Sequence, residues 1–420
     1  MTLVNKRIFK NFSAYFFSSI VAALVGLLAN PVLALKLSHS DYAVIGYYSS
    51  FTLLLTPIVT LSLQSYYARK YFMVDDVERE KIYGVLLTLF STISAVIFIV
   101  FVLLYHLYHS KLVESIPYSP YALLSFLPIY FSSFYNLYLT DLKMKGEGGK
   151  YAVVTIANSV LSALLSILLV YSLEYGAEGR LFALLLTTIL FFFYSVLAKR
   201  VHFQWNKMII RESLTFCWPL VVSGVLSFFF LGIDRVFLER LDDTHSLGLY
   251  NVGMQVSSYL SIFGTVLLQT FDPDLYKYTS RLEHKKVILL CVFVVIVVLL
   301  PNILFICCSK PIISLLTAGK YVDSVSFANI LCLKNVTTTF AYIMSGVIIG
   351  YGFSKYELLN RSLGAIISVL LYYILISKYG FYGAAWGQCL SWLFMGFISI
   401  LCLVLMFKRN VITEHNTTGV

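Results

Sequence analysis

Residues 218–250 read WPLVVSGVLSFFFLGIDRVFLERLDDTHSLGLY, an apolar run of membrane-spanning length that closes on Asp234 and Arg235 and then a short polar turn. An earlier stretch has the same plan. Residues 12–47 form an apolar run through Pro31 that ends in LKLSHSDYAVIGY. The two halves of the chain therefore begin alike.

The two halves also end alike. From Lys150 the chain passes through an apolar run, the sequence EYGAEG at residues 174–179, and a second run that closes on a basic pair. The same order recurs from Lys355 through KYGFYG at residues 378–383. A single Tyr-Gly-x-x-Gly turn arises by chance, but recurrence with the same flanks at an offset near half the chain indicates an internal repeat.

The composition is that of an integral membrane protein. Of 420 residues 59% are hydrophobic and 12% are charged, whereas soluble domains carry roughly 25% charged residues. The net charge of +10 therefore reflects loops beside a membrane, and no nucleic acid is expected as a partner. The seven cysteines lie in or beside apolar runs without CxxC spacing, so neither a metal site nor a cofactor is expected.

Twelve apolar runs have the length of about 20 residues that a spanning helix needs. They are continuous rather than alternating, which excludes barrel strands, and predict an all-α integral membrane protein with twelve transmembrane helices. The runs are 12–35, 42–68, 82–106, 119–141, 150–173, 178–198, 213–238, 246–272, 285–308, 322–349, 355–376 and 381–407.

The repeat divides the chain into two six-helix lobes. Residues 1–200 and 213–408 form the lobes, residues 201–212 a basic cytoplasmic linker, and residues 409–420 a cytoplasmic tail. Of 31 Lys and Arg residues, 22 fall in the N-terminal segment, alternate loops and the C-terminal end, which predicts that both termini are cytoplasmic. Six helices per lobe place the pseudo-two-fold axis along the membrane normal.

The order of these elements resembles a known family. The two lobes, LSHSDYAVIGY after the first run, its partner in residues 218–253, and the YGxxG turns before the sixth and twelfth runs are similar to the polysaccharide repeat-unit flippases of the multidrug/oligosaccharidyl-lipid/polysaccharide exporter superfamily. The resemblance covers the whole chain and rests on order and spacing. One departure is Ala43, where a glycine often follows the Asp-Tyr pair.

The resemblance implies a transporter of the bacterial inner membrane. Such a protein moves an undecaprenyl-pyrophosphate-linked oligosaccharide from the cytoplasmic to the periplasmic leaflet by alternating access between two lobes, for O-antigen, capsule or exopolysaccharide synthesis. Its partners are this anionic lipid-linked cargo, membrane lipids, a polysaccharide polymerase and a chain-length regulator. Coupling to H+, to Na+ or to the cargo gradient stays open.

A pyrophosphate cargo requires positive charge on a wet cavity wall. Lys334 lies well inside the run 322–349, where a charge is costly and should face a cavity or a partner; it either contacts phosphate or bonds to Asn329, Asn335 or a carbonyl group in its own lobe. Arg235 with Asp234 either receives the cargo or forms a solvated pair at the interface. Arg361 and Arg180 are further candidates that also suit topology charges.

Uncharged polar and aromatic side chains on the early helices of each lobe are candidates for sugar contacts. These are Asn30, Gln64, Asn251, Gln255, Gln269, Tyr48 and Tyr259. Pro31, Pro57 and Pro219 interrupt apolar runs and are either hinges or packing kinks.

Two alternatives use the same architecture differently. A cation-coupled multidrug exporter needs an acidic residue inside a lobe, and the acids of the first half lie in loops or at the ends of runs. A membrane glycan polymerase or ligase needs a sizeable outer loop with catalytic groups, and no loop here is that long. The sequence thus favours a transporter over an enzyme.

Overall fold

The structure is a computed structural model that describes residues 2–112, 115–200, 202–351 and 354–408. Side chains at residues 2–16, 110–112, 269, 273, 280, 354–355, 406 and 408 are not described. Over these ranges the chain is helical and has no β-strand, which confirms the all-α prediction.

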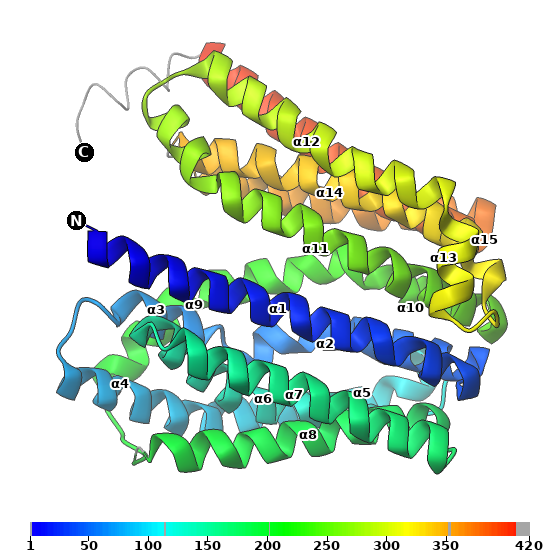
Figure 1. Cartoon of the computed structure of the whole chain (residues 1–420), viewed down its shortest axis with the longest axis horizontal. Coiled ribbons are helices and arrows are strands. Elements are labelled where there is room, and N and C mark those ends of the chain that lie inside the picture. The colour runs from blue at the N-terminus through cyan, green and yellow to red at the C-terminus, as the bar shows by residue number, and fades with distance from the viewer. Residues whose placement is uncertain (1, 113–114, 201, 352–353, 409–420) are drawn as a thin grey trace. The chain divides into compact units, whose positions relative to one another are not determined.

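The helices carry the labels of Figure 1. They are α1 Thr2–Lys36, α2 His39–Thr60, α3 Leu63–Lys70, α4 Asp76–Leu89, α5 Ala95–Leu112, α6 Tyr121–Lys145, α7 Gly148–Ile167, α8 Gly176–Lys199, α9 Lys207–Leu231, α10 Ile233–Glu239, α11 Thr244–Ser280, α12 His284–Cys307, α13 Ser309–Leu316, α14 Val325–Gly350 and α15 Ser354–Lys408. Two π-helical turns, η1 Phe90–Ser94 and η2 Leu168–Ser172, follow α4 and α7, and a 3-10 turn, η3 Val322–Ser324, precedes α14.

Each of the twelve predicted runs lies on helix. In the described residues ten helical segments are long and apolar enough to cross a membrane. One of these, Tyr356–Leu405, holds two predicted runs, because α15 continues through the non-helical Gly380. The run 246–272 lies on α11. The structure therefore agrees with a twelve-span layout.

Two predicted runs are interrupted. The run 42–68 is divided into α2 and α3 at Leu61 and Ser62, which both have positive φ angles, 47° and 50°. The run 213–238 is divided into α9 and α10 at Gly232, whose φ and ψ of −133° and −28° are not helical. Hydropathy does not report such breaks, because the backbone turns without any change in apolar character.

Contacts divide the chain into two compact units. The first unit is Met1–Phe228 with Leu316–Ala318, and the second is Phe229–Leu315 with Gly319–Val420. In the first unit α1 packs on α7, and α6 packs on α2 and α8; in the second, α14 packs on α11, α12 and α15. One apolar core surrounds Phe90 and Phe134, and another surrounds Val294 and Ile348.

The boundary of the units lies in α9 rather than in the linker 201–212. Residues of α9 up to Phe228 belong to the first unit, which they contact at several points. Gly224 lies so close to Pro57 of α2 that an added Cβ would be 2.5 Å from the proline Cβ. Two turns earlier in α9, the Cys217 thiol donates a hydrogen bond to the Ser62 carbonyl oxygen at 3.5 Å. The second half of the sequence thus supplies a helix to the first unit.

The repeated motifs adopt the same backbone geometry in both units. Gly176 and Gly380 have φ angles of +52° and +55°, a region that favours glycine. Three residues after each, a second glycine lies against backbone. A Cβ on Gly179 would be 3.1 Å from the Leu169 carbonyl oxygen, and one on Gly383 would be 2.0 Å from that of Leu375. The YGxxG pattern is therefore a steric requirement of the turn.

Gly383→Ala should destabilise the protein, because the new Cβ would clash with the Leu375 carbonyl oxygen. A backbone carbonyl, unlike a side chain, cannot rotate away from such a clash. The overpacking cost is about 1–3 kcal/mol or more, read as a lower unfolding temperature of the purified protein in detergent. Gly149→Ala, where nothing lies within 4 Å of the new Cβ, is the control. Equal unfolding temperatures for the two variants would contradict the steric reading.

Candidate functional site

The first unit encloses a polar cavity of about 440 Å³ between α1, α2, α6, α7 and α8. Its lining is rich in hydroxyl and amide groups and contains one arginine. The polar lining residues are Asn30, Ser49, Thr52, Ser125, Asn158, Ser159, Ser162, Ser166 and Arg180. No carboxylate lies among the described lining residues, so the cavity has a positive balance.

Small side chains create this space. Ser159, Ser162 and Ser166 recur at helical spacing on α7, and Gly26 of α1 has nothing within 4 Å of an added Cβ. Short side chains in helices that pack in a membrane leave room where longer ones would fill the interior. The cavity follows from the placement of small polar residues on two helices.

Arg180 is the single charged residue of the lining and lies in the second turn of α8. Its Nη1 atom is buried and has no hydrogen-bond partner among the described residues. A buried guanidinium donor without a partner is costly. Arg180 thus brings a buried donor without a partner to the cavity wall, and its role in binding cargo stays a prediction.

Asp41 fixes the start of the helix that carries Arg180. One carboxylate oxygen of Asp41 accepts a hydrogen bond from the Ala177 amide at 2.8 Å, and the other accepts from the Ser38 amide and hydroxyl, both at 2.7 Å. A Cβ on Gly176 would lie 2.7 Å from Asp41. The Asp-Tyr motif after the first run and the first YGxxG turn are therefore parts of one contact.

An exposed ion pair joins the end of α1 to the segment just before α8. Lys36, at the end of α1, pairs with Glu174 just before α8. The hydrogen bond from Lys36 and its charge hold the pKa of the Glu174 carboxyl below its usual value. Because both side chains are exposed, this pair adds little stability.

In the second unit Asp234 and Arg235 are buried, so the solvated pair that the sequence left open is not what the structure shows. Asp234 accepts hydrogen bonds from the Tyr250 hydroxyl at 2.6 Å and the Gln388 amide at 2.9 Å. Side chains from α11 and α15 thus bind one carboxylate oxygen of Asp234, and the other oxygen, Oδ1, has no hydrogen-bond partner among the described residues.

The break between α9 and α10 gives Arg235 its position. Its guanidinium donates to the Leu231 carbonyl at 3.2 Å, next to the break at Gly232, and to the Asn251 side chain at 2.8 Å. A broken helix exposes carbonyl groups that have lost their helical partners. Hydropathy alone does not report this, although the glycine before Ile-Asp-Arg is a signal for it.

Lys334 lies half-buried on α14. Its Nζ atom is 3.3 Å from the sulfur of Met254 on α11, and Asn251, one turn earlier on the same helix, accepts a hydrogen bond from Arg235. Asn335 does not hold it, because the Asn335 side-chain oxygen, which would accept the bond, has no hydrogen-bond partner among the described residues. Lys334, Asp234 and Arg235 therefore contact one stretch of α11, residues 250–254, and form one charged cluster around it.

The other predicted cation, Arg361, has a partner in its own helix. It donates to Glu357 at 2.8 Å, one turn earlier on α15, and its guanidinium carbon lies 6.0 Å from the centre of the Tyr342 ring. Glu357 is buried. The position of Arg361 therefore has a structural explanation, and its phosphate role stays a prediction.

The predicted sugar contacts lie in several places. Asn30 lines the cavity and donates to the Leu316 carbonyl at 2.9 Å. Asn251 is bound to Arg235. Tyr48 is fully buried and donates to the Pro117 carbonyl at 2.8 Å, so it would reach a sugar only after rearrangement. Gln64, Gln255 and Tyr259 are half-buried on α3 and α11, and the Gln269 side chain lies outside the described residues. All these roles stay predictions.

The predicted hinges are continuous helix. Pro31, Pro57 and Pro219 lie inside α1, α2 and α9. Pro57 contacts the α9 backbone at Gly224, which supplies a packing reason for that proline. A hinge role for the three stays a prediction.

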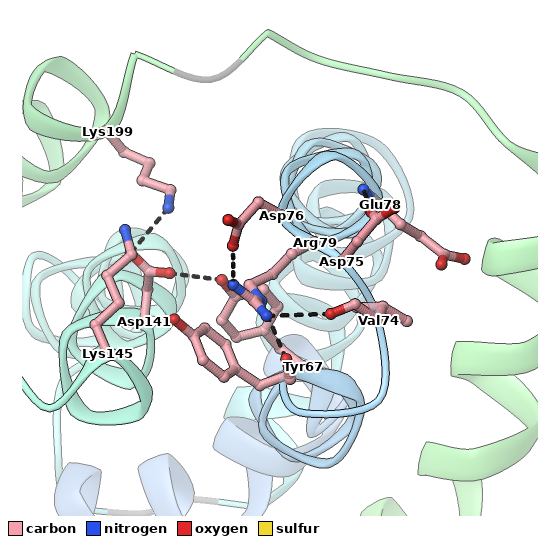
Figure 2. A network of polar contacts seen from close by, with 10 residues as sticks. Tyr67, Val74, Asp75, Asp76, Glu78, Arg79, Asp141, Lys145 and Lys199 are labelled. Atoms are coloured by element: carbon pink, nitrogen blue, oxygen red, sulfur yellow. Dashed lines mark hydrogen bonds and ion pairs between the residues drawn. The ribbon is translucent and has the colours of Figure 1, made fainter.

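Sequence reasoning missed a buried charge network in the first unit (Figure 2). Asp141, at the end of α6, is 1% exposed and accepts hydrogen bonds from Lys145 at 2.8 Å, Lys199 at 2.9 Å and the Tyr67 hydroxyl. These contacts join α3, α6 and α8. The signal available in the sequence was only an acid at the end of a run, which is also where a solvated acid lies.

Arg79 belongs to the neighbouring part of Figure 2. Its guanidinium pairs with Asp76 and donates to the carbonyls of Val74 and Tyr71 at 3.1 and 3.0 Å. It also stacks 4.1 Å from the centre of the Tyr71 ring. The turn between α3 and α4 is thus closed by one arginine.

Asp141→Asn should lower the free energy of unfolding by about 3–5 kcal/mol, because it leaves two ammonium groups beside each other without their shared carboxylate. The measurement is thermal unfolding of the purified protein. Glu147→Gln removes a more exposed pair with Lys150 and should cost about 0–1 kcal/mol. A D141N variant as stable as E147Q would show that the network is not stabilising.

The helices define an all-α protein with many segments that are long and apolar enough to cross a membrane. The chain matches the family described as "Polysaccharide biosynthesis protein" over residues 8–273, well over half its length. It belongs to this family.

Two further proteins and several solved structures are similar to the chain over most of its length. Two proteins of Haemophilus influenzae, "Lsg locus putative protein 1" and an "Uncharacterized membrane protein", are 22% and 21% identical; the matches cover 87% and 86% of this chain and 90% and 88% of theirs. An inward-facing "multidrug resistance MATE family transporter of the MOP superfamily" has a TM-score of 0.72 at 16% identity, covering 95% of this chain and 96% of that one. "Lipid II flippase MurJ, inward closed conformation" has a TM-score of 0.69 at 16% identity, covering 94% and 87%. These structures share the fold.

Proposed function

We propose that the protein moves an undecaprenyl-pyrophosphate-linked oligosaccharide repeat unit from the cytoplasmic to the periplasmic leaflet by alternating access. It does so in the bacterial inner membrane, with both termini in the cytoplasm, for O-antigen, capsule or exopolysaccharide synthesis. Membership of a polysaccharide biosynthesis family and a fold shared with a lipid II flippase support a lipid-linked glycan as cargo. A polysaccharide polymerase and a chain-length regulator are its proposed protein partners, and no enzymatic step is part of the proposal.

The observation that carries the proposal is the chemistry of the cavity in the first unit. Sugar hydroxyls stripped of water need hydrogen-bond partners, and the cavity offers hydroxyls and two amides, those of Asn30 and Asn158. A pyrophosphate needs a cation, for which the forked arginine side chain is well suited. Arg180, with one donor unused, supplies it. A lining that contains an arginine and no carboxylate repels cationic drugs.

The cluster in the second unit is the second proposed contact with cargo. Lys334, Arg235 and Asp234 carry a net positive charge, and the unused oxygen of Asp234 is a group that H+ or Na+ coupling could use. That oxygen also favours the second candidate function, a cation-coupled multidrug exporter, for which an acid inside a unit is required. The two functions differ in cargo, so the cargo decides between them.

Arg180→Gln should reduce surface glycan roughly ten- to hundredfold, because a charged hydrogen bond to phosphate contributes about 1.5–3 kcal/mol. The variant is expressed in the source bacterium lacking the native gene, and surface glycan and inner-leaflet lipid-linked repeat units are quantified. Arg180→Lys should keep part of the activity. Arg240→Gln, an exposed arginine at the end of α10, is the control.

Normal glycan with R180Q at normal protein level would remove the cavity from the mechanism. Unchanged glycan in the gene deletion, together with increased sensitivity to cationic drugs, would instead establish the multidrug exporter. Each outcome assigns the cargo independently of protein stability, since the protein level is measured in parallel.

Lys334→Ala should also reduce surface glycan at normal protein level, because it removes an interior cation from the second unit. Lys320→Ala, which removes an exposed lysine after α13, is the matched control. Equal glycan in the two strains would show that Lys334 makes no contact with cargo and serves only the packing of its unit.

A further inference from the structure

A second pocket lies in the first unit, between α3 and the start of α9, and none of its residues belongs to the cavity described above. Its volume is about 840 Å³, and four of its lining residues are cations: Arg69, Lys70, Lys207 and Arg211. Glu212 is the acid of the lining. The distribution of Lys and Arg along the chain assigns this end of the unit to the cytoplasm.

The acid in the pocket is already engaged. Glu212 pairs with Lys70 and accepts a hydrogen bond from the Tyr66 hydroxyl at 3.0 Å. In the described part of the chain Arg69, Lys207 and Arg211 form no ion pair with a carboxylate within 4.0 Å. The lining therefore carries four cations and one carboxylate, a net charge of +3.

Contacts within the first unit hold the elements that line this pocket in place. The Arg69 guanidinium lies 4.6 Å from the centre of the Phe216 ring, so it reaches from α3 across to α9. Lys207 and Arg211 are one turn apart on α9 and point to one side of it. The Asn206 side chain caps the helix by accepting from the amides of Met208 and Ile209. The positive end of the α9 dipole adds to the charge.

The linker before α9 is attached to α4, which fixes where Lys207 lies. The Thr88 hydroxyl donates to the Gln204 carbonyl at 2.8 Å, and the Gln204 amide donates to the Gly84 carbonyl at 3.4 Å. A Cβ on Gly84 would lie 2.5 Å from the His202 carbonyl oxygen, so only glycine permits this approach.

The linker also presents apolar side chains. Phe203, Trp205 and Met208 are 59%, 69% and 72% exposed. Exposed aromatic residues at the end of a spanning helix are typical of the membrane interface. The basic pocket is therefore placed at the level of lipid headgroups, where clusters of Lys and Arg bind anionic lipids.

We infer that this pocket, formed by Arg69, Lys207 and Arg211 beside the membrane-facing linker, binds the phosphate group of an anionic membrane lipid at the cytoplasmic surface. Arginine and lysine together suit a phosphate, by forked hydrogen bonds and by a point charge. The phosphate belongs either to a phospholipid headgroup or to a prenyl pyrophosphate. The site is distinct from the cavity of Arg180 and does not depend on the transport function proposed above.

The test measures binding of four probes to the full-length protein in detergent: phosphatidylglycerol, farnesyl pyrophosphate, inorganic pyrophosphate and neutral phosphatidylcholine. Lys207→Gln/Arg211→Gln should weaken binding of at least one phosphorylated lipid about thirtyfold, from the loss of two cations near a phosphate. Arg281→Gln/Lys285→Gln is the matched control, because it removes two exposed cations four residues apart at the end of another predicted cytoplasmic loop, where α12 begins.

The pattern of losses identifies the source of the phosphate. Loss for phosphatidylglycerol assigns a phospholipid, and loss for farnesyl pyrophosphate alone assigns a prenyl pyrophosphate. Equal loss for inorganic pyrophosphate shows that the headgroup suffices. Arg69→Gln, on the other helix, should weaken the same probe, and Gly84→Val should do so without removing any charge, since it displaces the linker. If K207Q/R211Q and R281Q/K285Q bind every probe equally, the charges serve topology only and the inference is wrong.

Discussion

A charge inside a membrane protein needs a partner, because hydrocarbon supplies no water to solvate it. The interiors of both units are arranged around this constraint. Asp141 is met by two lysines and a tyrosine, and Asp234 by a tyrosine and a glutamine. Arg180 at Nη1 and Asp234 at Oδ1 each keep a buried atom without a hydrogen-bond partner among the described residues. Of these two atoms, the Arg180 donor is the one that an anion would satisfy.

The two units share features at the starts of their helices but differ in the residues of their interiors. Ser38 and Asp243, which the repeat offset of 205 residues pairs, both cap the helix that follows them. The same offset pairs Asn30 with Arg235. In the first unit this position is an asparagine that lines the cavity. In the second unit it is an arginine that donates a hydrogen bond to Asn251. The helix starts that follow Ser38 and Asp243 are thus alike in the two units, whereas the interiors differ.

Much of this organisation could be predicted from the sequence. Continuous apolar runs predict the helices, and the repeat predicts the paired turns, because both depend on local backbone and solvent requirements. The charged interior could not be predicted in detail. From the sequence, Asp234 and Arg235 resemble a solvated pair at the membrane interface. In the structure they are buried, and they lie just after the helix break at Gly232. Asp141 at the end of a run gives no sign that Lys199, 58 residues later, will reach it. Such partners are set by tertiary packing, which neither hydropathy nor spacing encodes.

α9 runs from one compact unit into the other as continuous helix. The segment before α9 is hydrogen-bonded to α4, and the helix itself crosses the boundary between Phe228 and Phe229 before it ends at Leu231. Gly232 then separates α9 from α10, the short helix that carries Asp234 and Arg235. The covalent path from the first unit to the buried pair of the second is therefore helical except at one residue, so a substitution at that glycine acts on the pair directly.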